Sequence, residues 1–305
     1  LKGFTLLSPT LLVMGFTMCI PFGIMVVMSF WTQIGFEFDT VFTLGNYAEA
    51  IEKPVYRALL LRSLTISSIC TVVTVLVSYP MAYYVAFHVR KRKMAWIILM
   101  TVPFFSSYLL RIFAWKVILG YNGVINSGLK GLGLIEQPLA FLLYSPTAVV
   151  ITLAHAWAAF AILPIYISLE KIDRSLLEAA TDLGDSLVSR FFRITLPLSM
   201  PGVIAATIFV FIPTVGDYVT PNLVGGTNGI MIGNIIQSQF GKANNWPMGA
   251  ALALISMAFD LLFVGHHYYL AYFGSKNIKS KSQQESVKIQ NRATVSSDST
   301  LDIIW

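Results

Sequence analysis

The chain has 305 residues, of which 56% are hydrophobic and 12% charged, and its formal net charge is +6. A soluble globular domain is about a quarter charged, so this composition, with a mean hydropathy of +0.70, excludes that class and indicates a membrane protein. The positive charge does not indicate nucleic-acid binding, because the sequence has no basic helix interleaved with aromatic residues.

Apolar residues gather in six blocks, each long enough to cross a hydrocarbon core of about 30 Å, for which a helix needs about 20 residues. The blocks are continuous and lack the two-residue alternation of a membrane barrel. The first is too long for the apolar region of a signal peptide, which has about 7–15 residues. We therefore predict an all-α membrane protein with six transmembrane helices, Phe4–Trp31, Ser63–Phe87, Met94–Leu119, Thr147–Leu169, Pro201–Val219 and Met248–Phe273.

Lysine and arginine predict the orientation of these helices. If the N-terminus is cytoplasmic, 14 of the 21 Lys and Arg residues fall in inner segments and four in outer ones. This bias predicts that both termini are cytoplasmic. Residues 1–274 are predicted to form the membrane domain, with a long charged inner segment at 170–199, and residues 275–305 a polar, disordered cytoplasmic tail.

The second to fifth predicted spans each contain an interior proline, namely Pro80, Pro103, Pro164 and Pro213. Each proline removes a backbone donor and frees a carbonyl one turn earlier. Within a bilayer that carbonyl must be satisfied by a neighbouring helix, by water or by a cavity. The prolines therefore predict either bent helices around a cavity or the ordinary kinks of membrane helices.

The inner segment 170–199 is predicted to begin with a short helix. Ser175 and Glu178 have the spacing of a capping box, and Gly184 can adopt the left-handed conformation that ends a helix. Ala179 and Ala180 leave part of this helix nearly without side chains. Such a helix either fits a socket on another protein or serves as a simple connector.

The wider pattern of this segment resembles a known family. The residues that match the EAA loop of binding-protein-dependent ABC importer permeases, at its spacing, are Glu178, Ala179, Ala180, Gly184, Ile194, Leu196 and Pro197. The resemblance covers residues 4–273 and implies the type I ABC importer permease fold in the bacterial inner membrane. In that family the loop couples the membrane helices to an ATPase, so the resemblance implies an ATPase-coupling role for these residues and for Ser175.

The same resemblance implies the partners of the chain. They are an ABC ATPase dimer, which binds the ATP and Mg, a second homologous permease chain, and a periplasmic or surface solute-binding protein. The chain itself is expected to be no enzyme and to bind no cofactor or metal. Its sequence contains no G-x-x-x-x-G-K-[ST] string, and its four His residues lack the Cys or carboxylate spacing of a metal site.

Three further segments resemble the spermidine/putrescine branch of these permeases, namely Val102–Trp115, Gly120–Asn126 and Val215–Gly226. They imply a small cationic solute, with a polyamine (putrescine or spermidine) as the first choice. The alternative is a secondary transporter or channel for a small cation or amino-acid-like solute, which leaves the pattern of residues 175–197 unexplained.

Charged residues inside the predicted spans are candidates for the solute pathway, because a charge at a helix centre costs about 2.5–3.5 kcal/mol. Asp260 is predicted near the midplane and Asp217 nearer the outer face, where two carboxylates with aromatic walls could bind a dication. Each could instead make a structural contact, Asp217 at a helix end and Asp260 with a neighbouring hydroxyl. Arg111 is expected either to pair with Asp217 or to extend to the outer interface. The nearest aromatic candidates are Tyr108, Trp115 and Tyr218.

Overall fold

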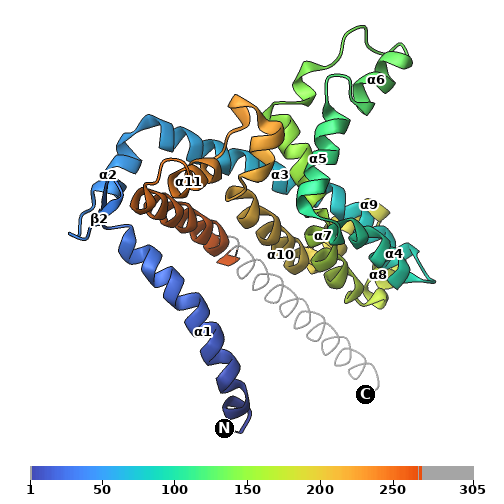
Figure 1. Cartoon of the computed structure of the whole chain (residues 1–305). Coiled ribbons are helices and arrows are strands. Elements are labelled where there is room, and N and C mark those ends of the chain that lie inside the picture. Colours follow the sequence, from blue (N-terminus) through green and yellow to red (C-terminus); the bar gives the residue numbers. More distant parts are fainter. Residues whose placement is uncertain (1, 267, 270–305) are drawn as a thin grey trace, which may run out of the picture. The chain divides into compact units, whose positions relative to one another are not determined.

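The computed structural model of the chain describes residues 2–266 and 268–269 (Figure 1). The chain divides into a unit of residues 1–261 and a second unit of residues 262–305. The first unit contains every strand and helix named below, apart from the end of the last helix. The predicted tail, 275–305, lies outside the described residues.

The described residues are mainly helical, as predicted, and six helices are long and apolar enough to cross a membrane. These are Leu7–Met28, Pro54–His88, Tyr108–Gly131, Pro146–Glu170, Leu187–Val215 and Trp246–His266. The symbol η marks a 3-10 or π-helical turn. The elements before the helix Trp246–His266 are, in chain order, α1 (Lys2–Met28), β1 (Thr32–Ile34), β2 (Glu37–Asp39), α2 (Gly45–Glu52), α3 (Pro54–Tyr83), η1 (Tyr84–His88), α4 (Lys93–Thr101), η2 (Val102–Phe105), α5 (Tyr108–Leu119), α6 (Val124–Gly131), η3 (Ala140–Leu142), α7 (Pro146–Glu170), α8 (Arg174–Asp182), α9 (Leu187–Arg190), η4 (Phe191–Thr195), α10 (Leu196–Val215), η5 (Pro221–Gly225), η6 (Thr227–Gly229) and α11 (Ile232–Phe240).

A small hairpin departs from the all-α prediction. β1 and β2 follow α1 and pair antiparallel, with Gln33 opposite Phe38. Gly35, in the turn between them, has a φ of +63°, which glycine adopts without a steric penalty. Strands of three residues are too short for an alternating pattern to be recognised in the sequence.

The third predicted span is broken, which corrects the continuous helix Met94–Leu119. α4 gives way to the 3-10 turn η2, which has Pro103 in its first turn. Ser106 and Ser107 are then extended, with ψ values of 157° and 131°, before α5 begins. Because proline has no N–H to donate and disfavours a helical residue before it, the helix is weakest at this point.

The fifth span begins earlier than the predicted Pro201. Helical turns run from Leu187 through α9, η4 and α10 to Val215. The π-helical turn η4 ends two residues before Pro197, whose missing N–H interrupts the regular hydrogen-bond ladder. The second half of the predicted inner segment 170–199 is therefore the start of a membrane helix.

Three helices, α3, α7 and α10, pack against one another and form most of the core. At Gly202 on α10, a Cβ atom would collide with the carbonyl O of Pro164 on α7, so glycine permits the two backbones to approach closely. Half of the apolar stretch of α7 is buried, whereas none of the apolar stretch of α1 is. Pro80, Pro164 and Pro213 lie inside the three core helices, as predicted, and Pro201 also lies inside α10.

Candidate functional site

The helix α8 lies outside the six spans, and its N-terminal end is capped. The cap is Asp173, whose Oδ1 accepts a hydrogen bond from the backbone N–H of Ser175 (3.0 Å). This corrects the predicted capping box, because Ser175 and Glu178 both lie within the helix and the capping residue comes two positions earlier. The hydrogen bond holds the pKa of the Asp173 carboxyl below its ordinary value.

The C-terminal end of α8 is a Schellman motif, which confirms the role predicted for Gly184. Gly184 has a φ of +86°, and its N–H donates to the carbonyl O of Thr181 (2.9 Å). The N–H of Asp185 donates to the carbonyl O of Ala180 (2.9 Å). Both bonds satisfy carbonyls at the helix end, so α8 has a defined length.

An apolar face of α8 is exposed. Leu176, Ala179 and Leu183 follow at intervals of three and four residues, which places them on one side of the helix. Leu176 is 47% exposed and Leu183 is 87% exposed. Ala180 is only 4% exposed. The two alanines therefore differ, since Ala179 belongs to the exposed face and Ala180 packs inward.

Side chains from the start of the fifth span hold α8 in place. Arg190 donates a hydrogen bond to Oγ1 of Thr181 (2.6 Å). Asp185, just after α8, accepts a hydrogen bond from Ser189 (2.9 Å) and pairs with Arg193 (3.0 Å). These contacts fasten α8 to α9 and η4. The other predicted coupling residues lie farther along the same helix, with Ile194 in η4 and Leu196 and Pro197 at the start of α10.

The start of α8 is also linked to the turn that follows α3 and η1. Lys93 Nζ lies 2.7 Å from the carboxylate of Glu170 and donates to the carbonyl O of Ala86 in η1 (2.9 Å). Arg174, the first residue of α8, donates to the same carbonyl (3.4 Å). These contacts connect α8 to the end of α3, so a displacement of α8 would move α3 as well as the fifth span.

The structure separates the six predicted pathway residues into three pairs. They are Tyr108 with Asp217, Arg111 with Trp115, and Tyr218 with Asp260. Each pair has a different environment, and the third combines an unengaged carboxylate oxygen with an open cavity.

Asp217 lies just beyond the end of α10 and is 8% exposed. Its Oδ2 accepts a hydrogen bond from the hydroxyl of Tyr108 (2.7 Å), and its Oδ1 accepts one from the N–H of Val219 (3.0 Å). The Tyr108 hydroxyl also lies 2.9 Å from Oγ1 of Thr220. Both carboxylate oxygens are engaged, and the bonds join α5 to the turn that follows α10.

Arg111 lies on α5, next to the break in the third predicted span. Its guanidinium donates to the carbonyl O atoms of Phe104 (3.4 Å), Ser106 (3.3 Å) and Ala156 (3.1 Å). The predicted pairing with Asp217 is therefore wrong, and the alternative, extension to the outer interface, stays a prediction. The guanidinium instead satisfies the carbonyls of Phe104 and Ser106 beside the break, and it also binds the carbonyl of Ala156 on α7.

Trp115 lies beside Arg111 on the wall of a mostly apolar cavity of about 550 Å³ between α3, α4, α5 and α7. Its ring meets the ring of His155 edge-on, with 5.4 Å between the ring centroids. The two residues thus form a corner of this cavity. They do not line the cavity that contains Asp260.

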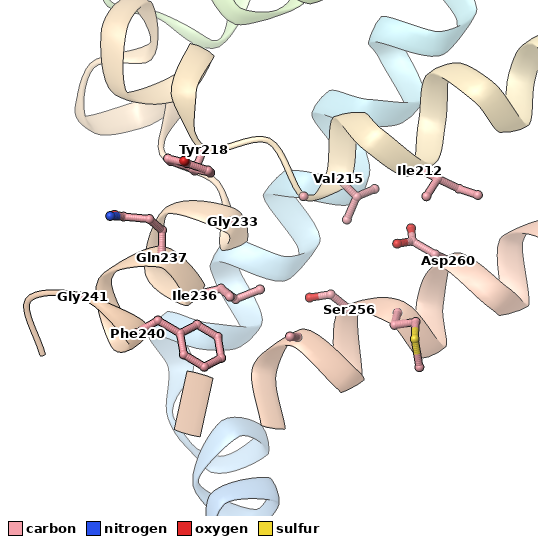
Figure 2. Close-up of a pocket in the computed structure, with 13 residues that line it drawn as sticks. Ile212, Val215, Tyr218, Gly233, Ile236, Gln237, Phe240, Gly241, Ser256 and Asp260 are labelled. Carbon is pink, nitrogen blue, oxygen red and sulfur yellow. The ribbon is translucent and has the colours of Figure 1, made fainter. Parts of the chain in front are cut away.

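Asp260 lines an open cavity of about 630 Å³ between α10, α11 and the helix Trp246–His266. Figure 2 shows its carboxylate directed towards Ile212 and Val215 of α10, with Ser256 one turn earlier on its own helix. Within the part of the chain that the structure describes, the buried Oδ1 of Asp260 has no hydrogen-bond partner. Tyr218, 43% exposed, lines the same cavity.

Several residues of these sites were not singled out from the sequence. Ser256 precedes Asp260 by four residues, a spacing that puts both on one helix face and could have identified it. Gln237 and Phe240 come from α11, which the sequence alone does not bring next to the last helix. The contacts that hold α8 likewise depend on residues whose type is common, namely Asp173, Asp185, Arg190 and Arg193.

Residues 43–271 match the family described as the binding-protein-dependent transport system inner membrane component. The chain belongs to this family. It is a non-catalytic, multi-pass inner-membrane permease component of an ABC importer, which confirms the family resemblance of the loop.

The chain is also similar to individual permeases of this family. The chain is 39% identical over 214 residues to the spermidine/putrescine transport system permease protein PotB of Escherichia coli (strain K12), an alignment that covers 70% of this chain and 77% of the relative. It is 36% identical over 260 residues to PotB of Haemophilus influenzae, with 84% and 89% covered. It is 34% identical over 233 residues to the inner membrane ABC transporter permease protein YdcU of Escherichia coli (strain K12), with 73% and 74% covered.

Two solved structures share the fold. Both are of a bacterial ABC transporter for alginate, and they match with TM-scores of 0.65 and 0.67 at 15% sequence identity. The matches cover 89% and 88% of this chain and 96% and 95% of the solved chains. At this identity the likeness concerns the fold, which is that of an ABC importer permease.

Proposed function

We propose that this chain forms half of the translocation pathway of an ATP-driven importer for a small cationic solute, with a polyamine as the first choice. The observation that carries the polyamine assignment is the 36–39% identity to PotB proteins over 70–84% of the chain. An open cavity with one carboxylate, Asp260, supports a cationic solute. A second homologous permease chain would supply the other half of the pathway.

We propose further that α8 is the coupling helix, and that the loop from Ser175 to Pro197 binds the ATPase. The support is the exposed apolar face of Leu176, Ala179 and Leu183, on a helix capped at both ends and fastened to the fifth span. Leu183, the residue directly after α8, has an apolar side chain that is 87% exposed, which suits a surface that another protein covers. ATP and Mg would bind to the ATPase.

The proposed orientation places α8 and both termini in the cytoplasm, with residues 1–274 as the permease domain and 275–305 as a cytoplasmic tail. The excess of Lys and Arg in the segments on that side supports it. The solute would be delivered by a periplasmic or surface solute-binding protein. One solved alginate transporter, which shares the fold, is described as a complex with an alginate pentasaccharide-bound periplasmic protein.

The substrate assignment is tested on the solute-binding protein that would deliver solute to this permease. Calorimetric titration of that protein with putrescine, spermidine, amino acids and sugars is expected to give saturable binding of a polyamine and no heat from the sugars. Tight binding of an amino acid or a sugar, with no response to polyamines, would contradict the assignment.

The coupling assignment is tested by co-purification of the complex. Gly184→Asp, at the φ of +86°, and Ala179→Trp, on the exposed face, are each expected to remove the ATPase from the purified chain while the chain still inserts. Val41→Trp is the matched control and should retain the ATPase. Val41 is 68% exposed and lies between β2 and α2, in a segment that the proposed orientation places on the other side of the membrane. Recovery of a normal complex from both loop variants would rule out α8 as the coupling helix.

A further inference from the structure

The cavity around Asp260 has the size and walls of a small-ligand site. Its volume of about 630 Å³ falls within the range of about 300–1,000 Å³ that is usual for such sites. Apolar side chains make up much of the wall, among them Ile212, Val215 and Met257. Among the lining residues that the structure describes, Asp260 is the only charged one.

One end of this cavity contains two groups that can still accept a hydrogen bond, the carboxylate of Asp260 and the hydroxyl of Ser256. The buried Oδ1 of Asp260 has no partner in residues 2–266, although a buried carboxylate oxygen is costly unless a donor satisfies it. Ser256 donates its hydroxyl proton to the carbonyl O of Leu252 (2.9 Å), so the lone pairs of this hydroxyl remain available as acceptors. A protonated primary amine carries three donors and no acceptor, which complements this set.

The other side of the cavity is aromatic and neutral. Figure 2 shows Tyr218, Gln237 and Phe240 on the side away from Asp260. Aromatic faces attract cations weakly and pack well against methylene groups, so they suit the body of an alkylamine. They offer no second carboxylate for a second ammonium group.

Asp217 does not provide that second carboxylate. Gly216 and Tyr218 line the cavity, whereas the intervening Asp217 is turned the other way, towards Tyr108. Its two oxygens already accept hydrogen bonds from Tyr108 and from the N–H of Val219. The cavity therefore neutralises one positive charge and not two.

We propose that this cavity binds one protonated primary amine end of an alkylamine solute, with Asp260 and Ser256 as acceptors and with the apolar wall against the methylene groups. This inference rests on the proposed function and deepens it. The second charged end of a diamine is bound by the partner permease chain. The site in this chain consequently recognises a monoamine such as butylamine as well as putrescine.

The site is tested by cysteine labelling in the complete transporter, reconstituted in lipid. Met257→Cys places a thiol in the cavity wall and leaves Asp260 and Ser256 intact; it is combined with Cys19→Ser, since Cys19 is exposed and Cys70 is buried. A thiol reagent that carries an ammonium group is expected to label the cysteine at position 257 about tenfold more slowly in the presence of either putrescine or butylamine, and at an unchanged rate with butanol. This protection should be lost when Asp260→Asn is added. Equal labelling with and without the amines would overturn the proposal, and so would protection by putrescine alone.

Uptake kinetics provide the second test. Asp260→Asn is isosteric and is expected to raise the KM for putrescine about 10-fold to 100-fold, because a charge-assisted hydrogen bond is lost, while Asp260→Glu recovers part of it. Glu52→Gln removes an exposed carboxylate at the end of α2 and should leave the KM unchanged. An unchanged KM in Asp260→Asn would refute the site. If the wild-type transporter imports no polyamine, the proposed substrate class fails, and protection by butylamine still decides whether the cavity binds an amine.

Discussion

Asp217 and Asp260 differ in what satisfies their carboxylates. Asp217 is 8% exposed and accepts hydrogen bonds from Tyr108 and from the N–H of Val219. Asp260 lines an open cavity, and its buried Oδ1 has no partner in the described chain. The two acidic residues thus differ in their hydrogen-bond partners, and we propose that this difference separates a structural role from a ligand-binding role.

The largest effect on stability is expected from Asp217→Ala. The substitution leaves the Tyr108 hydroxyl and the Val219 N–H without their acceptor, which should lower the free energy of unfolding by about 2–4 kcal/mol. Denaturant unfolding of the purified complex measures this change. Asp260→Ala is the matched control and should change the free energy by less than about 1 kcal/mol. Equal losses in the two variants would remove the distinction between the two carboxylates.

A smaller loss of stability is expected from Tyr108→Phe. The ring remains to pack against Trp157, 6.1 Å away between centroids, but the hydrogen bond to Asp217 is lost. The expected cost is about 1–2 kcal/mol in the same unfolding measurement. In a double-mutant cycle with Asp217→Asn the two effects should be strongly non-additive, and simple additivity would show that the pair does not interact.

Ser256→Ala is expected to act on the solute and not on the fold. It removes a neutral acceptor from the cavity and should raise the KM for uptake about threefold, with the maximal rate and the unfolding midpoint unchanged. Uptake of labelled putrescine by the reconstituted transporter measures it. Thr220→Val removes a hydroxyl next to Tyr108 and serves as the comparison, for which a change of stability and an unchanged KM are expected.

The smallest effect is expected at Asp173. Its carboxylate is exposed and, like that of Asp217, accepts a hydrogen bond from a backbone N–H two residues later. Because its pKa is lowered in the folded chain, its ionised form stabilises the start of α8 at neutral pH. This contribution is lost as the pH falls below the ordinary Asp value of about 3.9 and through the lowered pKa. Amide exchange at Ser175 and Leu176, corrected for intrinsic rates, should show less protection at the lower pH. In Asp173→Asn, whose amide oxygen still accepts but does not titrate, this pH step should be absent.

Local patterns predicted much of the fold. Six apolar blocks gave the number of spans, and Gly184 gave the end of α8, because both signals are contained in the segment itself. The start of α8 was predicted wrongly because two capping residues, Asp173 and Ser175, stand two positions apart and the backbone selects one of them. Pro103 indicated a weak point in the third predicted span. The sequence did not show that Arg111 stabilises a complete break there through hydrogen bonds to backbone carbonyls.

The candidate site was predictable only in part. Asp217 and Asp260 were found because charge is rare in apolar segments, but their different roles depend on distant residues. Tyr108 reaches Asp217 across 109 positions of sequence, and no local pattern reports that contact. Ser256 was within reach of the sequence, since it lies one helical turn from Asp260.

The most direct measurement is solute-stimulated ATP hydrolysis by the complete transporter in lipid, with Asp217→Asn and Asp260→Asn purified in parallel. Asp260→Asn is expected to keep its basal hydrolysis and unfolding midpoint and to lose stimulation by putrescine at concentrations that saturate the wild type. Asp217→Asn is expected to keep its stimulation wherever the complex remains folded and to show a lower unfolding midpoint. Normal stimulation in Asp260→Asn, together with selective loss of stimulation in a stable Asp217→Asn, would contradict the account.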